Sequence, residues 1–184
     1  MPDGRSIYDR KTQTAPGSTS MPLIKDGAFA EDHFQAVADD APLPANGTIV
    51  SLARFKKDRE SLLARNAPLG VRLQSSESPE ALGDDVHRLS VVVLEFPKFR
   101  DGRAFSWARM LRTRLGFKGE IRAAGHFLYD QLAFMTRVGF DAFEVRENFT
   151  EAEFARAMGE MTYVYQPSAD GRPTIRDLRA HAHS

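Results

Sequence analysis

Cysteine is absent from the 184 residues of the chain. This absence excludes disulfide bonds, a thiolate nucleophile, cysteine-ligated zinc sites and iron–sulfur clusters held by cysteine alone. No stretch approaches the roughly 18 consecutive apolar residues of a membrane-spanning helix, and the amino terminus lacks the apolar core of a signal peptide. We therefore predict a cytoplasmic protein with no membrane partner and no thiol redox chemistry.

The chain also lacks a net charge, because 25 Lys and Arg residues balance 25 Asp and Glu residues. Attraction of the whole molecule to nucleic acid is therefore not expected, and any electrostatic function needs a local patch. The motifs G-x-G-x-x-G, G-x-x-x-x-G-K, G-x-S-x-G and H-E-x-x-H are missing as well,. We predict no cofactor, no metal ion and no nucleic-acid partner.

What is present has the composition of a globular domain, with 42% hydrophobic and 27% charged residues,. Residues 1–20 are polar and rich in turn formers, which predicts a disordered leader and makes Met21 a candidate for the true start. Residues 21–167 are predicted to form a single α/β domain. Residues 168–184 have little to bury and are predicted to be a mobile tail, in which His181 and His183 are solvated rather than metal ligands.

Between these ends, short β-branched runs alternate with helical patterns, which is typical of βα units and a mainly parallel sheet. The predicted strands of these units are residues 48–52, 69–73, 89–96, 119–125 and 141–147. Residues 23–37 are predicted to form an N-terminal β-hairpin with its turn at Asp26-Gly27, and residues 163–167 a final short strand. Five βα steps fit either a partial TIM-like barrel or an open doubly wound sheet.

The segment after the third of these strands combines a helical apolar stripe with many cations. The stripe comprises Ala104, Trp107, Ala108, Leu111 and Leu115, and it predicts a helix that packs one face on the sheet,. Eight basic residues lie in the same region: Lys98, Arg100, Arg103, Arg109, Arg112, Arg114, Lys118 and Arg122. Nucleic-acid binding is one interpretation of this charge, but a solvated arginine face of the helix is favoured.

Parallel α/β folds place their ligand sites at the carboxyl ends of the strands. The residues predicted at this edge are polar and mostly basic, and the N-terminus of the following helix would present free backbone N–H groups. These features predict a site for a small anion. The candidate binding residues are Arg54, Lys98, Arg100, Asp101, Gly102, Arg103 and Arg146.

Four residues of the same edge are candidates for acid–base catalysis, namely Glu95, Lys98, Asp101 and His126,. For Glu95 the alternative is a carboxylate paired with Lys98 or with an arginine, because an unpaired buried carboxylate is costly. His126 is either a proton shuttle or a polar residue at the start of a helix. No reaction follows from these residue types alone.

The block from Glu95 to Arg112, "EFPKFRDGRAFSWARMLR", resembles the pattern EFPKF-DGR-(F/Y)S-AR-LR of the bacterial family called domain of unknown function 934. Further similar stretches are "LIKDGAF", "PLGVRL", "DQLAFMTRVGFDAFEVR" and the ending "YQP", so that the resemblance covers residues 23–167. The chain departs from the pattern at His126 and Tyr129, where many relatives carry an acidic and a basic residue. This departure weakens any catalytic role inferred from the family at that position.

The resemblance implies a link to sulfur metabolism, because members are commonly encoded beside assimilatory sulfite or nitrite reductase and are often labelled as oxidoreductases of sulfite reduction. Two hypotheses follow. The chain is either an accessory protein that binds the reductase, another sulfur-assimilation enzyme or a small oxyanion through its basic strand ends, or an enzyme with an acid–base site of unknown reaction.

Overall fold

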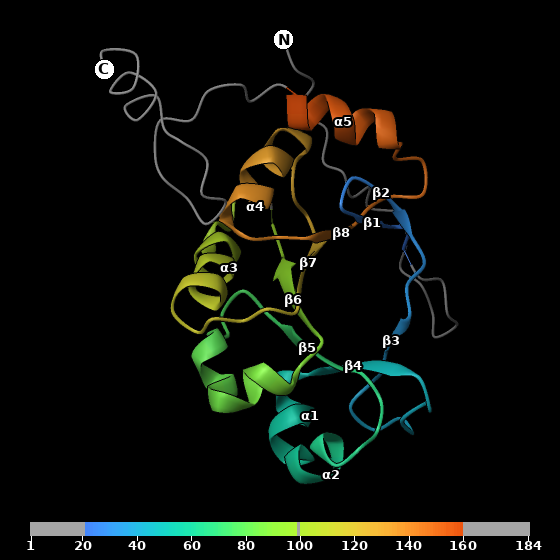
Figure 1. Cartoon of the computed structure of the whole chain (residues 1–184), viewed down its shortest axis with the longest axis vertical. Helices are drawn as coiled ribbons and strands as arrows, with labels where there is room; N and C mark the ends of the chain where they lie inside the picture. The colour runs from blue at the N-terminus through green and yellow to red at the C-terminus, as the bar shows by residue number, and fades with distance from the viewer. Residues whose placement is uncertain (1–20, 99, 160–184) are drawn as a thin grey trace, which may run out of the picture.

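The computed structural model of the protein describes residues 21–98 and 100–159. An eight-stranded sheet curls into a half-barrel with the strand order β2-β1-β8-β7-β6-β5-β4-β3 (Figure 1). The strands are β1 Leu23–Lys25, β2 Ala28–Ala30, β3 Phe34–Ala36, β4 Gly47–Ser51, β5 Leu69–Leu73, β6 Val91–Phe96, β7 Glu120–Gly125 and β8 Ala142–Glu144. The helical segments are α1 Leu52–Lys57, α2 Arg59–Leu63, η1 Pro79–Arg88, α3 Arg103–Thr113, η2 Tyr129–Gln131, α4 Leu132–Val138 and α5 Glu151–Gly159.

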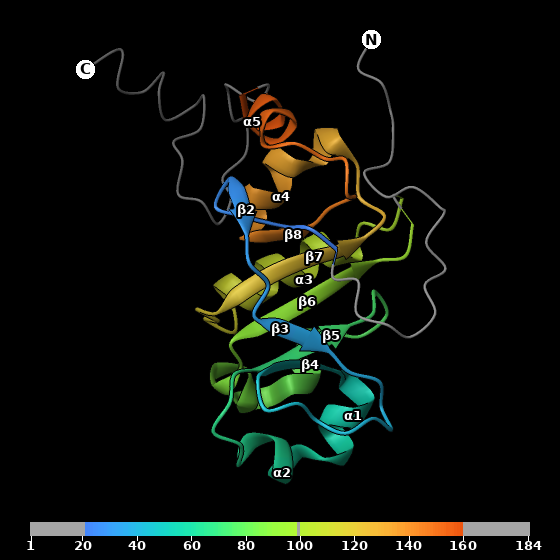
Figure 2. The ribbon, with the colours of Figure 1, turned by 90° about the vertical axis from the view of Figure 1, so that its right-hand side faces the viewer.

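The sheet is mixed, which corrects the prediction of a mainly parallel sheet. Strands β3 to β8 are parallel and follow one another in sequence order, whereas β1 pairs antiparallel with both β8 and β2. Because the strand order from β3 to β8 never reverses, the parallel part matches a partial barrel rather than a doubly wound sheet. The helical connections lie together on one side of this part of the sheet, and the opposite, concave side faces the viewer in Figure 2.

The first three strands differ most from the expectation for residues 23–37. Strands β1 and β2 lie at one edge of the sheet, but β3 lies at the other edge, where it pairs in parallel with β4. Residues 31–33, which we call the strap, join the two edges across the open side of the half-barrel (Figure 2). Three-residue strands carry too short a pattern for the sequence to assign their partners.

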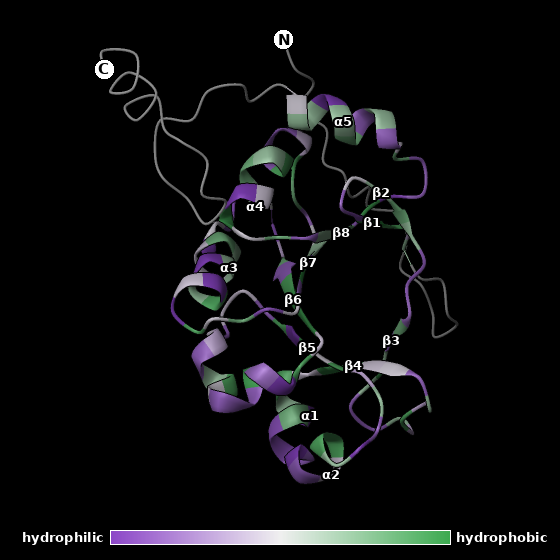
Figure 3. Ribbon diagram, viewed as in Figure 1, coloured by the Kyte–Doolittle hydropathy of each residue, from purple (hydrophilic) through white to green (hydrophobic). Residues whose placement is uncertain are grey.

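The main core lies between the sheet and the helices. Val92, Leu94 and Phe96 of β6 point into it and meet the stripe of α3, of which Ala104, Ala108 and Leu111 are buried. Trp107 is half-buried and packs against this core, as the helical spacing predicts. In Figure 3, α3 carries both hydrophobic and hydrophilic residues, as expected for a helix with one packed face,.

A second, smaller apolar cluster lies on the concave side of the sheet. It consists of Ile49, Val91, Val93 and Ala124, with Phe34 of β3 packed against it. Successive side chains of a strand point to opposite faces of the sheet, so these residues and the core residues lie on opposite faces. Charged side chains of β5, β6, β7 and β8 occupy the rest of the concave side.

The predicted leader (1–20), final strand (163–167) and tail (168–184) lie outside the described residues, and so do His181 and His183. Across residues 21–98 and 100–159 no helix is both long and apolar enough to cross a membrane.

Candidate functional site at the carboxyl ends of the strands

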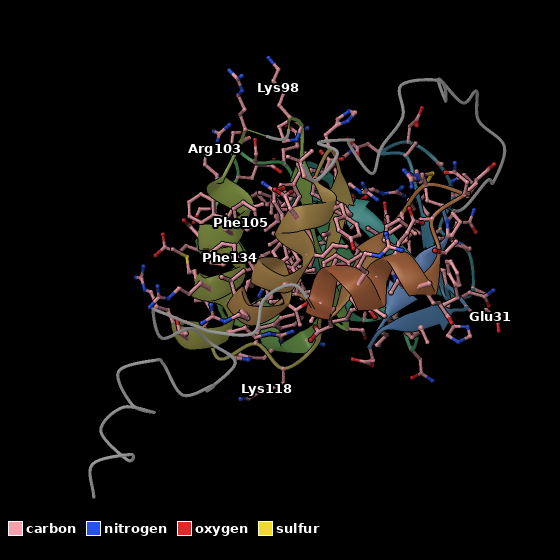
Figure 4. All side chains as sticks on the ribbon, turned by 90° about the horizontal axis from the view of Figure 1, so that it is seen from above. Glu31, Lys98, Arg103, Phe105, Lys118 and Phe134 are labelled. Atoms are coloured by element: carbon pink, nitrogen blue, oxygen red, sulfur yellow. The ribbon has the colours of Figure 1, made fainter. Side chains whose placement is uncertain are left out.

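The loop between β6 and α3 carries the largest group of predicted binding residues. Lys98 and Arg100 are exposed on this loop and Arg103 is exposed at the first position of α3; we call these three residues the basic rim. Figure 4 shows Lys98 and Arg103 projecting near one another from the same edge of the molecule. These cations lie just after the carboxyl end of β6, as predicted, and their role in binding stays a prediction.

Asp101 holds the rim in shape. Its carboxylate accepts hydrogen bonds from Nε (2.9 Å), Nη2 (2.7 Å) and the backbone N (3.2 Å) of Arg103. Arg103 Nη2 also donates to Ser75 Oγ at 2.9 Å, which ties the rim to the loop after β5. The start of α3 at Gly102 was predicted to offer free N–H groups to an anion, but Asp101 already accepts from the first of them.

The interactions of Asp101 fix its charge. Hydrogen bonds from Arg103 and Ser75 hold the pKa of the Asp101 carboxyl well below its ordinary value of 3.8. The group is therefore ionised at neutral pH and has no proton to donate. Asp101 acts as a positioning residue for Arg103 in this structure.

Asp101→Asn should weaken this tether in a pH-dependent way. Because the folded-state pKa is lowered, the carboxylate contributes to stability above about pH 3.8 and loses that contribution as the pH falls through its folded-state value,. The variant should be less stable than the wild type at pH 7, and the difference should shrink below about pH 3.8. Urea unfolding followed by the fluorescence of Trp107, whose Nε1 donates to Ser75 O at 3.0 Å, measures both effects. A difference that is independent of pH would contradict this role.

The structure does not add Arg54 and Arg146 to the basic rim. Arg54 is buried and donates to the backbone carbonyls of Ala38 and Ala41, the latter at 2.7 Å. Arg146 Nη2 donates to Glu153 Oε1 at 2.8 Å. Both guanidinium groups hold local chain segments together, which one strand-end position in a sequence cannot reveal.

Glu95 lies on the concave side and is paired with an arginine. Its Oε1 is 3.2 Å from Arg72 Nη1, and Arg72 Nη2 lies 3.2 Å from Glu144 Oε1. Of the two interpretations of Glu95, the geometry matches the ion pair, with Arg72 rather than Lys98 as the partner. The side chain is half-exposed rather than buried.

His126 follows β7 at a tight bend. Gly125 has φ +91°, and a Cβ atom there would lie 2.5 Å from the carbonyl oxygen of Phe96. The backbone N of His126 donates to that same oxygen at 2.6 Å. Glycine thus lets the chain turn tightly against β6, and His126 becomes a half-buried residue of this bend,.

A buried charge network on the concave side was missed by sequence reasoning. Arg122 of β7 is only 1% exposed and donates to both carboxylate oxygens of Asp32 in the strap, at 2.7 and 3.0 Å. Its Nε donates to Glu120 at 2.9 Å, and Lys25 Nζ donates to the other oxygen of Glu120 at 2.9 Å. Burial lowers the pKa of Arg122, but Asp32 and Glu120 outweigh it and raise that pKa above its ordinary value.

The sequence did hold a signal for this network. In β7, Glu120 and Arg122 alternate with the apolar Ile121 and Ala123, which is the period of a strand with one polar face. The prediction treated this segment only as another strand of the sheet. Asp32, the partner of Arg122, lies in the strap, 90 residues earlier in the chain.

At the amino ends of the strands, Arg112 bonds to two loops, the one between α3 and β7 and the one between α4 and β8. Its Nη1 donates to the carbonyls of Phe117 and Gly119, both at 2.8 Å, its Nε donates to Gly139 O at 3.1 Å, and its Nη2 pairs with Asp141. This corrects the prediction of a solvated arginine face for Arg112, because its donors are used inside the protein. Burial raises the pKa of Asp141, whereas the amide of Ile121 and Arg112 act to lower it.

A cleft of about 930 Å³ lies beside Arg112. Its lining combines apolar side chains of the core with polar groups, and it includes Asp26, Lys118, Phe140, Asp141, Phe154 and Met158. In the part of the chain that the structure describes, no three His, Asp or Glu residues are arranged to hold a metal ion.

Comparison with known proteins identifies the family. The model of a family described as "Bacterial protein of unknown function (DUF934)" matches residues 70–175, which are 106 of the 184 residues. The chain belongs to this family. No curated protein and no solved structure matches the chain.

Membership of the DUF934 family confirms the resemblance drawn from the block "EFPKFRDGRAFSWARMLR". The resemblance was predicted over residues 23–167. The family model begins later, at Gly70, and also ends later, at residue 175. In this DUF934 protein the charged residues of the block fall into three separate sets of contacts. Glu95 pairs with Arg72, Asp101 pairs with Arg103, and Arg112 bonds to the loops at the opposite end.

Proposed function

We propose that this DUF934 protein is an accessory protein of assimilatory sulfite reduction that binds the reductase through its basic rim. The exposure of Lys98, Arg100 and Arg103 within six consecutive residues is the observation that carries the proposal. Residues 98–103 hold these three cations and one carboxylate, Asp101, so their net charge is +2. Complementary charge of this kind speeds association with an acidic protein surface.

The rim is better suited to a macromolecule than to a small oxyanion. The two arginines that would have enclosed an ion, Arg54 and Arg146, are engaged elsewhere, and Asp101 occupies the first amide of α3. What remains is a group of exposed cations, of which Arg103 is already bonded to Asp101. Such groups steer protein partners, whereas small ligands prefer concave sites.

The alternative of an acid–base enzyme at the same edge receives less support. Glu95 is paired with Arg72, and Asp101 is ionised and bound to Arg103. A general acid needs a proton to donate, and a general base needs an unengaged oxygen within reach of a substrate.

Lys98→Glu should weaken binding to the sulfite or nitrite reductase of the same organism. Reversing one exposed charge at a charged interface is expected to lower the affinity by about 3- to 30-fold at low salt, chiefly through a slower association rate. Biolayer interferometry with the purified reductase at about 20 and 300 mM salt measures the change, because added salt screens exposed charges.

Lys118→Glu is the matched control. Lys118 is also an exposed lysine, but it lies at the opposite end of the molecule from Lys98 in Figure 4. The proposal requires that this variant binds like the wild type. Equal effects of both variants would show that the attraction is electrostatic but not specific to the rim. If the wild type does not bind the reductase, the proposed function is wrong.

A further inference from the structure

An exposed pair of aromatic rings lies beside the basic rim. Phe134 of α4 is 41% exposed, and its ring centroid is 5.3 Å from that of Phe105 in α3. Phe105 is half-buried and makes an edge contact with Phe96 of the core, also at 5.3 Å. Phe105 therefore fixes the pair to the core while Phe134 presents its ring to solvent.

Phe134 is not needed to pack its own helix. Its neighbours Leu132, Ala133, Met135 and Val138 are all buried and supply the packed face of α4. A large exposed ring carries a cost in water, since apolar surface there is unfavourable. The described residues hold only one other large hydrophobic side chain that is as exposed, Phe29 of β2.

The aromatic pair is continuous with the basic rim. Phe105 lies two residues after Arg103, in the first turn of α3, and the exposed Arg109 follows one turn later on the same helix. Figure 4 shows Arg103, Phe105 and Phe134 in succession along one side of the molecule, below Lys98. Phe105 thus lies between two exposed cations, Arg103 and Arg109, along α3.

We propose that Phe105 and Phe134 form the apolar anchor of the docking surface whose cationic part is the basic rim. This inference rests on the proposed function and specifies the partner surface: an acidic protein surface with an apolar pocket that receives the ring of Phe134. Buried aromatic side chains bordered by polar and charged residues dominate the affinity of many protein interfaces. The cations set the rate of association and the rings set the rate of dissociation.

Charge argues against a second copy of this chain as the occupant. A twofold contact brings the same surface of both subunits together. Lys98, Arg103 and Arg109 of one copy would then face the same cations of the other, and like charges across an interface are unfavourable. An acidic partner instead satisfies both parts of the surface.

Phe134→Ala tests the anchor, with Phe29→Ala as the matched control at 47% exposure. Binding of the purified reductase should weaken at least about tenfold in Phe134→Ala, mainly through faster dissociation, and should stay within about twofold of the wild type in Phe29→Ala. The loss in Phe134→Ala should persist at high salt, unlike that in Lys98→Glu. Melting temperatures of both phenylalanine variants should stay close to that of the wild type, since both rings are exposed.

The outcomes separate this inference from the proposed function. If Lys98→Glu weakens binding but Phe134→Ala does not, the rim binds the partner and the aromatic anchor is refuted. If the wild type does not bind the reductase, both proposals fail. If the wild type forms dimers that Phe134→Ala abolishes, as measured by analytical ultracentrifugation, a second copy covers the rings and the anchor proposal is overturned.

Discussion

Arg122→Met should lower the free energy of unfolding by about 3–5 kcal/mol, the cost of removing one partner from a buried ion pair. The substitution keeps most of the side-chain length but leaves the carboxylates of Asp32 and Glu120 without the cation that they share. Glu144, 3.7 Å from Arg122, loses an opposite charge as well. Chemical denaturation at pH 7 followed by circular dichroism measures the effect.

Two further variants separate loss of charge from loss of packing. Arg114→Met removes an arginine that is 66% exposed and paired with Glu80, and it should change stability by no more than about 0.5 kcal/mol,. Adding Asp32→Asn to Arg122→Met should recover part of the loss, because it removes one uncompensated, part-buried charge,. Additive losses in the double variant would show that the network is not coupled as the distances indicate.

Arg112→Ala should destabilise the fold by about 2–4 kcal/mol, because it leaves part-buried acceptors without donors. These acceptors are the carbonyls of Phe117, Gly119 and Gly139 and the carboxylate of Asp141. The segments concerned lead into β7 and β8, so both strands lose an attachment at their amino ends. Thermal and urea unfolding measure the loss. Relative to the wild type, the rate of hydrogen exchange should increase most in residues 116–119 and 139–141.

Arg109→Ala is the control within the same helix. Arg109 lies less than one turn before Arg112 and is exposed, so its removal should change stability by no more than about 0.5 kcal/mol,. If both variants lose equal stability, a general effect of charge on α3 explains the result and the specific role of Arg112 is wrong.

Long periodic segments were predictable from the sequence, whereas strand partners were not. The β-branched run of β6 and the stripe of α3 are local patterns, and both formed where predicted. The partners of β1 and β3 depend on contacts between distant segments, and each strand has only three residues. The mixed character of the sheet arises from β1 and β2, which also have only three residues each, and this is why it escaped prediction.

The candidate site shows the same division between local and distant contacts. The gathering of Lys98, Arg100 and Arg103 was predictable, because they follow one strand within seven residues. The partners of Glu95 and Arg112 were not, since Arg72 and the loop carbonyls reach them only through the fold. Phe134 is 41% exposed beside buried residues of the same helix, and local spacing cannot tell which apolar side chain of a helix stays exposed.

The pairing of β1 with β8 has a consequence for the order in which the protein assembles during synthesis. Leu23 lies opposite Glu144, so β1 can pair with β2 at once but has to wait for more than a hundred further residues before its second partner, β8, exists. Strands β3 to β8, in contrast, can each add to the strand made just before. Until β1 arrives, the edge of β8 is unpaired and open to other chains. Strand β1, which is made before the parallel strands, therefore completes its pairing after all of them.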